Sequence, residues 1–69
     1  MTYYAIRYII KAGEVKSPVI KQGNKEDMER QFYLFCANAS TNSEENDFDA
    51  CEFGTLEGGK LKREVFDRR

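Results

Sequence analysis

The feature that most constrains the fold is one amphipathic helix that the pattern predicts in the middle of the chain. Its apolar side chains recur at positions i, i+4, i+7, i+8 and i+11, which places them on one helical face: Met28, Phe32, Phe35, Cys36 and Ala39. Asn24 suits the N-terminal cap of this helix, and the pattern ends near residues 38–40. We expect the apolar face to pack on the segments that flank it.

Two strands are predicted before this helix. Residues 3–11 are rich in β-branched and aromatic side chains, which are typical of a central strand. A short turn follows, in which Gly13 can take a positive φ. Residues 15–21 form the second strand, and we place it at an edge of the sheet because Pro18 lacks an N–H group.

Two further strands are predicted after the helix, at residues 48–56 and 61–66, joined at a Gly-Gly pair. A two-residue turn at this pair would set Phe53 opposite Glu64. A longer turn with a bulge would set Phe53 opposite Val65. The imperfect alternation of these strands leaves both registers open.

These elements predict a single α+β domain over residues 1–69, with the order ββαββ. The simplest assembly is a four-stranded antiparallel sheet with the helix packed on one face. We favour the strand order 2-1-3-4, which puts the apolar first strand inside and the strand with Pro18 at an edge. The order 2-1-4-3, with the first and fourth strands parallel, is the alternative.

The alternation within the first strand predicts which of its faces meets the helix. Its even positions are all apolar, and we expect them to pack on the helix: Tyr4, Ile6, Tyr8 and Ile10. Its odd positions are mixed and would lie on the open face of the sheet: Tyr3, Ala5, Arg7 and Ile9.

The sequence contains no arrangement typical of an enzyme. The absence of histidine removes the commonest general base and metal ligand. No glycine-rich phosphate-binding motif occurs. The sequence therefore predicts no catalytic residue, no metal site and no cofactor, and we expect that the protein is not an enzyme.

The two cysteines match no zinc-binding spacing. Cys36 lies on the apolar helix face and could meet Cys51 across the core. The N-terminal residues lack the pattern of a signal peptide, and no apolar stretch is long enough to span a membrane. We therefore expect a cytoplasmic protein whose thiols are both reduced.

The C-terminal half carries two groups of charged side chains. We expect an acidic run to be solvated, because its spacing matches no calcium-binding loop: Glu44, Glu45, Asp47, Asp49 and Glu52. The C-terminal hairpin and the residues after it are locally basic: Lys60, Lys62, Arg63, Arg68 and Arg69. The formal net charge of −1 gives no overall attraction to nucleic acid.

Two surfaces combine aromatic, apolar and arginine side chains that have no predicted role in the core. One is the outer face of the helix, with Arg30, Tyr33 and Leu34, and the other is the open sheet face, with Tyr3, Arg7 and Ile9. This composition is typical of protein interfaces. The main hypothesis is a small protein-interaction module that acts by surface binding, including self-association as a homodimer.

The alternative hypothesis is a single-stranded nucleic-acid-binding domain that uses the open sheet face. Tyr3 would stack on bases, while Arg7 and the basic final strand would contact phosphates. No RNP-like aromatic motif is present, so nucleic acid is the less favoured partner.

Residues 29–36 (ERQFYLFC) and 49–57 (DACEFGTLE) resemble parts of a group of short uncharacterised proteins carried on mobile elements of Gram-positive bacteria. The resemblance covers about half the chain and includes no catalytic motif, so it implies no functional residues. The size and the strand–helix layout are also similar to small phage-encoded inhibitors, such as some anti-CRISPR proteins. That likeness concerns architecture alone, and architecture does not determine function.

Overall fold

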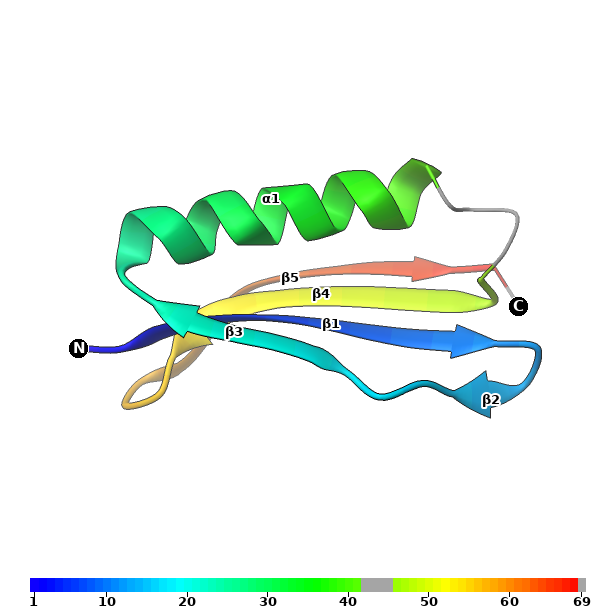
Figure 1. Ribbon diagram of the computed structural model, residues 1–69, viewed down its shortest axis with the longest axis horizontal. Helices are drawn as coiled ribbons and strands as arrows, with labels where there is room; N and C mark the ends of the chain where they lie inside the picture. The colour runs from blue at the N-terminus through cyan, green and yellow to red at the C-terminus, as the bar shows by residue number, and fades with distance from the viewer. Residues whose placement is uncertain (42–45, 69) are drawn as a thin grey trace.

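A computed structural model of the protein describes residues 1–41 and 46–68, which form one helix and an antiparallel sheet (Figure 1). The elements in chain order are β1 (Tyr3–Lys11), β2 (Glu14–Val15), β3 (Val19–Gly23), α1 (Lys25–Thr41), β4 (Phe48–Thr55) and β5 (Gly59–Asp67). The predicted second strand is divided into β2 and β3, with Pro18 between them, and both parts pair with β1.

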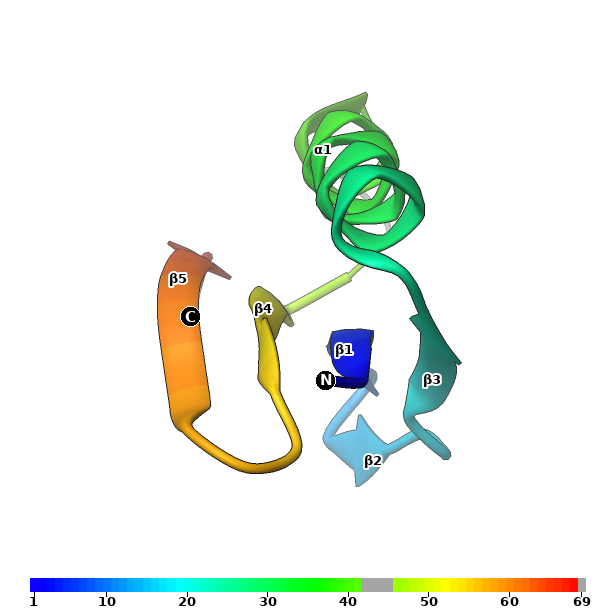
Figure 2. The ribbon, with the colours of Figure 1, turned by 90° about the vertical axis from the view of Figure 1, so that its left-hand side faces the viewer.

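The α+β class and the favoured strand order are confirmed. β1 lies inside the sheet, between the edge formed by β2 and β3 and the neighbouring β4, and β5 forms the other edge. All these pairs are antiparallel. Figure 2 shows α1 above one face of the sheet, while no helix lies on the opposite side, where β2 and the turn between β4 and β5 extend below the central strands.

The helix begins and packs as its pattern predicts. The side-chain oxygen of Asn24 accepts a hydrogen bond from the backbone N–H of Asp27 at 2.8 Å, so Asn24 caps the N-terminus. The apolar face of α1 is buried against the sheet. Its buried residues are Met28, Phe32, Phe35 and Ala39, with Cys36 partly buried beside them.

The prediction that the even residues of β1 face the helix is wrong. Ala5 lies in the same buried cluster as Phe32 and Phe35 of the helix, and the odd residues of β1 share its side of the strand. A close-packed interface needs space for two large rings, and the small side chain of Ala5 provides it. The even residues of β1 therefore lie on the face that the helix does not cover.

The turn between β4 and β5 starts earlier than predicted. Thr55 pairs with Gly59, and Phe53 pairs with Lys62 after a bulge, so both registers considered for this hairpin are wrong. The hydroxyl of Thr55 accepts a hydrogen bond from the N–H of Gly58 at 2.7 Å, which stabilises the earlier turn. The Gly-Gly pair therefore marks the end of the turn and the first residue of β5.

The turn between β1 and β2 has two residues with positive φ, Ala12 at 54° and Gly13 at 80°. This geometry matches the twist of a hairpin, and the positive φ predicted for Gly13 is confirmed. The N–H of Gly13 donates to a carboxylate oxygen of Asp47 at 3.1 Å. The turn is thereby attached to the segment that leads into β4.

Candidate interaction surface

Arg7 lies under the helix, in a buried ion pair with Asp49. Its Nε and Nη2 atoms donate to Oδ1 of Asp49 at 3.1 and 2.9 Å, and Asn46 donates to Oδ2 at 3.1 Å. Arg7 is therefore not on the open face. The prediction of a solvated acidic run is wrong for Asp49, which is fully buried, while Glu44 and Glu45 lie outside the described residues.

Arg68 connects the end of the chain to the same carboxylate. Its Nη1 atom donates to Oδ2 of Asp49 at 2.9 Å and to the carbonyl oxygen of Asn46 at 3.3 Å. Its Nη2 atom donates to the carbonyl oxygen of Ala39. Carbonyls in the last turn of a helix lack partners within the helix, and a cation there is favourable. This cluster of charges thus holds α1, β1, β4 and the chain end together, which is a structural role.

Tyr3 and Ile9 also lie on the side of the sheet that the helix covers. Tyr3 is stacked on Phe53, with 5.7 Å between ring centroids, and packs against the core. Ile9 is half-buried and pairs in register with Asp49. The sequence therefore placed the three residues Tyr3, Arg7 and Ile9 on the wrong face.

Cys36 and Cys51 meet between the helix and the sheet, as the sequence allowed. Both are free thiols, with Cys51 buried and Cys36 partly exposed. Burial raises the pKa of both thiols, and that of Cys51 reaches about 12. Because the thiolate is the reactive form, neither sulfur is activated as a nucleophile at neutral pH.

The outer face of α1 carries Arg30, Tyr33 and Leu34, as predicted, and all three are exposed. Tyr33 is nevertheless engaged by the sheet. Its hydroxyl accepts a hydrogen bond from Nζ of Lys62 at 2.9 Å, which raises the lysine pKa, and the same amine lies 5.2 Å from the ring centroid. Glu29 pairs with Lys62 at 3.6 Å, so part of this face serves to attach β5 to the helix.

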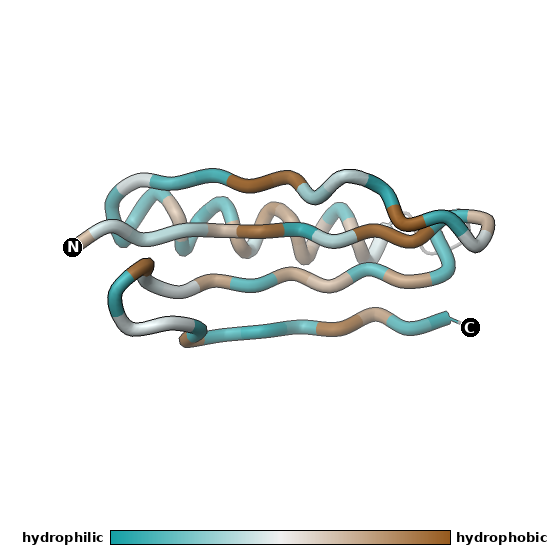
Figure 3. Tube along the Cα trace, turned by 90° about the horizontal axis from the view of Figure 1, so that it is seen from below, coloured by the Kyte–Doolittle hydropathy of each residue, from teal (hydrophilic) through white to brown (hydrophobic). Residues whose placement is uncertain are grey.

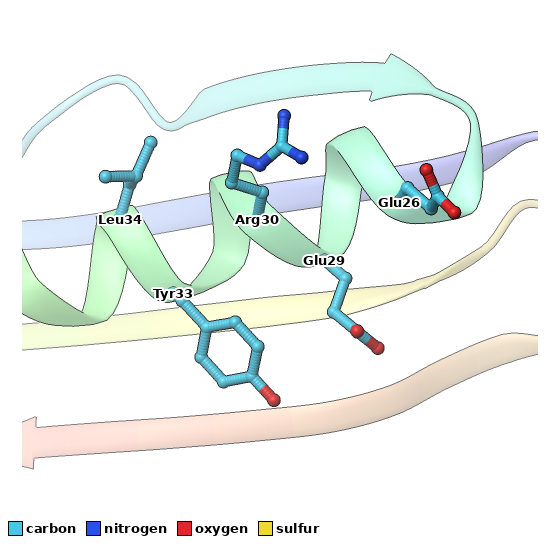
Figure 4. A pocket seen from close by; sticks show the side chains of 5 residues that line it. All are labelled: Glu26, Glu29, Arg30, Tyr33 and Leu34. Atoms are coloured by element: carbon cyan, nitrogen blue, oxygen red, sulfur yellow. The ribbon is translucent and has the colours of Figure 1, made fainter.

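A shallow depression also lies on the outer face of α1. It is lined by Glu26, Glu29, Arg30, Tyr33 and Leu34 (Figure 4). All five come from one helix, and Figure 4 shows Glu29 and Tyr33 projecting toward β5 while Arg30 and Leu34 project to the other side. Side chains that diverge in this way do not enclose a small ligand, which usually binds in a concave site with converging polar groups.

The sheet face opposite the helix, here called the open face, is the more apolar of the candidate surfaces. Strand register places these apolar side chains on it: Tyr4, Ile6, Tyr8, Ile10, Val15, Ile20, Phe48, Ala50 and Val65. Tyr4 and Ala50 are buried among their neighbours, so the exposed part of this surface comes from the other seven. Ile20 is 55% exposed and Tyr8 39%. In Figure 3, which views this face, hydrophobic segments of β3 and β1 lie side by side, with another on β5. An extended exposed apolar patch is typical of a binding surface.

The charges on the open face are balanced. Register places Glu52 beside Arg63, and Lys60 and Asp67 near opposite ends of β5. The hydroxyl of Tyr4 donates to Glu52 at 2.6 Å, and burial together with this bond raises the tyrosine pKa to about 12. Among the residues that the structure describes, these two acidic and two basic side chains give the open face no net attraction for a polyanion.

At each end of the open face, one segment of the chain bends away from the helix. Figure 1 shows the turn between β4 and β5 at one end of the sheet and β2 at the other, both lying below the plane of the central strands. The first end carries Leu56 and the second carries Val15, and both side chains are exposed. The apolar surface therefore continues toward both ends of the sheet.

The described residues contain no group of three or more His, Cys, Asp or Glu side chains placed to hold a metal ion. Within residues 1–41 and 46–68, no helix combines the length and the apolar character needed to cross a membrane.

Comparisons with protein-family models, curated proteins and solved structures find no match for this chain. The resemblance of residues 29–36 and 49–57 to proteins of mobile elements therefore stays a prediction. The geometry of the open face is then the main guide to function.

The sequence contained a signal for the correct face, and the apolar pattern of β1 concealed it. Asp49 sits inside a predicted strand, where a carboxylate is buried only with a partner. Arg7 is the one basic residue between the first and last positions of β1. Pairing these two residues would have assigned the odd face of β1 to the interior and left Ile6 and Tyr8 outside.

Proposed function

We propose that the protein is a small protein-binding module whose working surface is the open face of the sheet. The observation that carries this proposal is the orientation of β1. Its large apolar side chains Ile6, Tyr8 and Ile10 lie on the face that no described element covers, while Ala5 lies under the helix. Large apolar side chains left uncovered in this way favour a partner that buries them.

The balanced charge of the open face supports a protein partner in particular. Non-specific nucleic-acid binding depends on basic side chains that neutralise phosphates, whereas Glu52 and Asp67 offset Lys60 and Arg63. Protein interfaces combine an apolar centre with a polar rim. The same combination is found here, with Ile6 central and Lys60 near one end of the edge strand β5.

The test is site-specific photo-crosslinking in living cells. A benzophenone amino acid replaces Tyr8 on the open face in one variant and Tyr33 on the outer helix face in the matched variant, two tyrosines of comparable exposure. We expect a covalent adduct with protein from position 8 and little from position 33. Adducts from position 33 alone would indicate that the outer helix face is the binding surface. The absence of any protein adduct from position 8 would refute the proposal.

Single-stranded nucleic-acid binding is the second candidate, because an exposed aromatic ring, Tyr8, shares the open face with Arg63. The earlier basis for this hypothesis, Tyr3 and Arg7, lies under the helix instead. Fluorescence anisotropy with a labelled oligonucleotide distinguishes the two functions. Binding that weakens steeply as salt rises would favour nucleic acid, and an absence of binding at low salt would exclude it.

A further inference from the structure

We infer that the partner of the open face is a second copy of this chain, bound face to face about a two-fold axis that runs across the strands. This inference depends on the proposed function, since it names the protein that the open face binds. It follows from the size of the face, the distribution of its charges and the pairing of its apolar residues.

The size of the open face suits a partner of the same size. The molecule extends 36, 19 and 15 Å along its principal axes, and Figures 1 and 2 show that the helix is stacked on the sheet along the 19 Å direction. The face therefore projects an area on the order of 500 Å², and the accessible surface of its side chains is larger. Each partner in a standard interface buries about 800 Å².

An interface of this size forms only if the partner covers nearly the whole face. A single bound peptide strand is about 5 Å wide and would cover roughly a third of it. A second sheet covers the part of the face that lies between the β4–β5 turn and β2, as in proteins where two sheets pack face to face. An area of this order is typical of a weak interface, so we expect a dissociation constant in the micromolar range or above.

The charges on β5 match those of a second copy in this orientation. Lys60 lies near one end of the strand and Asp67 near the other, both on the open face by register. An axis across the strands sets β5 antiparallel to its own copy, so Lys60 of each chain lies opposite Asp67 of the other. Near the axis, Glu52 and Arg63 are cross-strand neighbours of opposite charge, so neither chain brings an uncompensated charge to the centre.

The apolar residues also become self-complementary. The position midway between Lys60 and Asp67 along β5 corresponds to the level between Ile6 and Tyr8 on β1. The two-fold axis therefore sets Ile6 of one chain opposite Tyr8 of the other, and the same contact forms a second time. Reciprocal contacts of this kind define a symmetric two-fold interface.

Sedimentation equilibrium from micromolar to millimolar protein is the first test. The wild type should rise from the mass of one chain, 8.0 kDa, toward twice that mass. Ile20→Lys should weaken association at least tenfold, while Leu34→Lys, at a site of nearly equal exposure (52% against 55%) on the helix, should leave it unchanged. Equal melting temperatures by circular dichroism in dilute solution, where both variants are monomeric, will show that both variants fold. A wild type that stays monomeric, or equal association of the two variants, would overturn the inference.

Charge reversal tests the axis itself. Lys60→Asp and Asp67→Lys should each weaken association roughly three- to tenfold, because each places like charges opposite one another at both ends of the interface. The double variant restores opposite charges and should return to within about twofold of the wild type. Single variants without effect, or a double variant weaker than both, would refute this two-fold arrangement.

The crosslink at position 8 separates failure of this inference from failure of the proposed function. An adduct with the mass of two chains supports the second copy. An adduct with a different protein, from a chain that is monomeric in solution, overturns the second copy and retains the protein-binding function. No protein adduct from position 8 overturns both.

Discussion

The two faces of the sheet differ in a way that their hydrophobicity does not predict. The covered face of β1 and β4 contains the small Ala5 and Cys51 and a charged pair, Arg7 with Asp49. The open face of β1 carries the larger apolar side chains, among them Ile6. The helix therefore packs where small side chains leave room and where buried charges can be paired, and these requirements outweigh the apolar content of the strand face.

This difference separates stability from binding. The covered face contains the interlocked aromatic rings and the charged cluster, so it should account for most of the free energy of unfolding. The exposed apolar area of the open face adds little to the free energy of unfolding until a partner removes it from water. Substitutions on the covered face should consequently lower the free energy of unfolding of the monomer more than substitutions on the open face.

The largest loss should follow from Phe35→Ala on the covered side. Phe35 is buried among the core residues, and removing a buried ring costs roughly 3–5 kcal/mol, which is much of the stability of so small a domain. Urea unfolding followed by circular dichroism measures the loss. The neighbouring Leu34→Ala is the matched control, and its exposed side chain should cost less than about 0.5 kcal/mol. A wild-type melting temperature for Phe35→Ala would contradict this assignment of the core.

A smaller loss, about 3 kcal/mol, should follow from Asp49→Asn. This change keeps the size of the side chain but leaves Arg7 and Arg68 without their shared negative charge, and breaking a buried ion pair is costly. The value lies at the low end of the usual range because the side chain of Arg68 is 19% exposed and can reach water. Glu14→Gln removes an exposed charge and should be nearly neutral. Equal urea midpoints for the two variants would refute the buried cluster.

Alkaline unfolding should distinguish the two faces by their titrating groups. Cys51 on the covered side and Tyr4 on the open side both have a pKa raised to about 12. A group whose pKa is higher in the folded state stabilises the fold fully below its unfolded pKa, and this contribution is lost as pH rises toward the folded value. The loss should begin near pH 9 for the thiol and near pH 10 for the phenol, at their ordinary pKa values.

Urea unfolding at pH 8, 9.5 and 11 measures this loss. Between pH 8 and 11 we expect about 2–3 kcal/mol from Cys51 and about 1 kcal/mol from Tyr4. Cys51→Ala should remove most of the loss that begins below pH 10, with a remainder from Cys36, whose pKa burial also raises, whereas Tyr4→Phe should reduce only the loss above pH 10. A wild type equally stable at pH 8 and 11 would show that neither group is buried as described.

The sequence predicted those features that depend on local pattern. The helix, its Asn24 cap and its buried stripe from Met28 to Ala39 follow from spacing alone, and the edge position of the strand with Pro18 follows from its missing N–H. The face of β1 depends instead on packing between distant segments. Neither the fit of Ala5 beneath the helix nor the partner of Arg7 is encoded within β1 itself.

Only half of the candidate site could be predicted from the sequence, because only that half depends on local pattern. Arg30, Tyr33 and Leu34 lie on the outer helix face because helical spacing determines that face. Tyr3, Arg7 and Ile9 were assigned to the open sheet face by alternation, and a shift of one residue moves every side chain of a strand to the other face. The surface proposed for binding includes the residues of β1 that the sequence had assigned to the core.

The smallest effect is expected for Ile20→Thr on the open face. Threonine keeps the β-branched shape that suits a strand, and Ile20 is largely exposed. In dilute solution the free energy of unfolding should therefore change by less than about 0.5 kcal/mol. A loss above 1 kcal/mol in dilute solution would show that the open face also supports the fold of the monomer.

A difference should emerge only at high concentration. Self-association stabilises the wild type by mass action, so its melting temperature should rise with concentration, and that of Ile20→Thr should rise less. Leu34→Thr, which makes the same kind of polar change on the helix, should follow the wild type at every concentration. If the melting temperatures of all three chains are independent of concentration, binding to a second copy does not contribute to stability, and the two faces differ in packing but not in self-association.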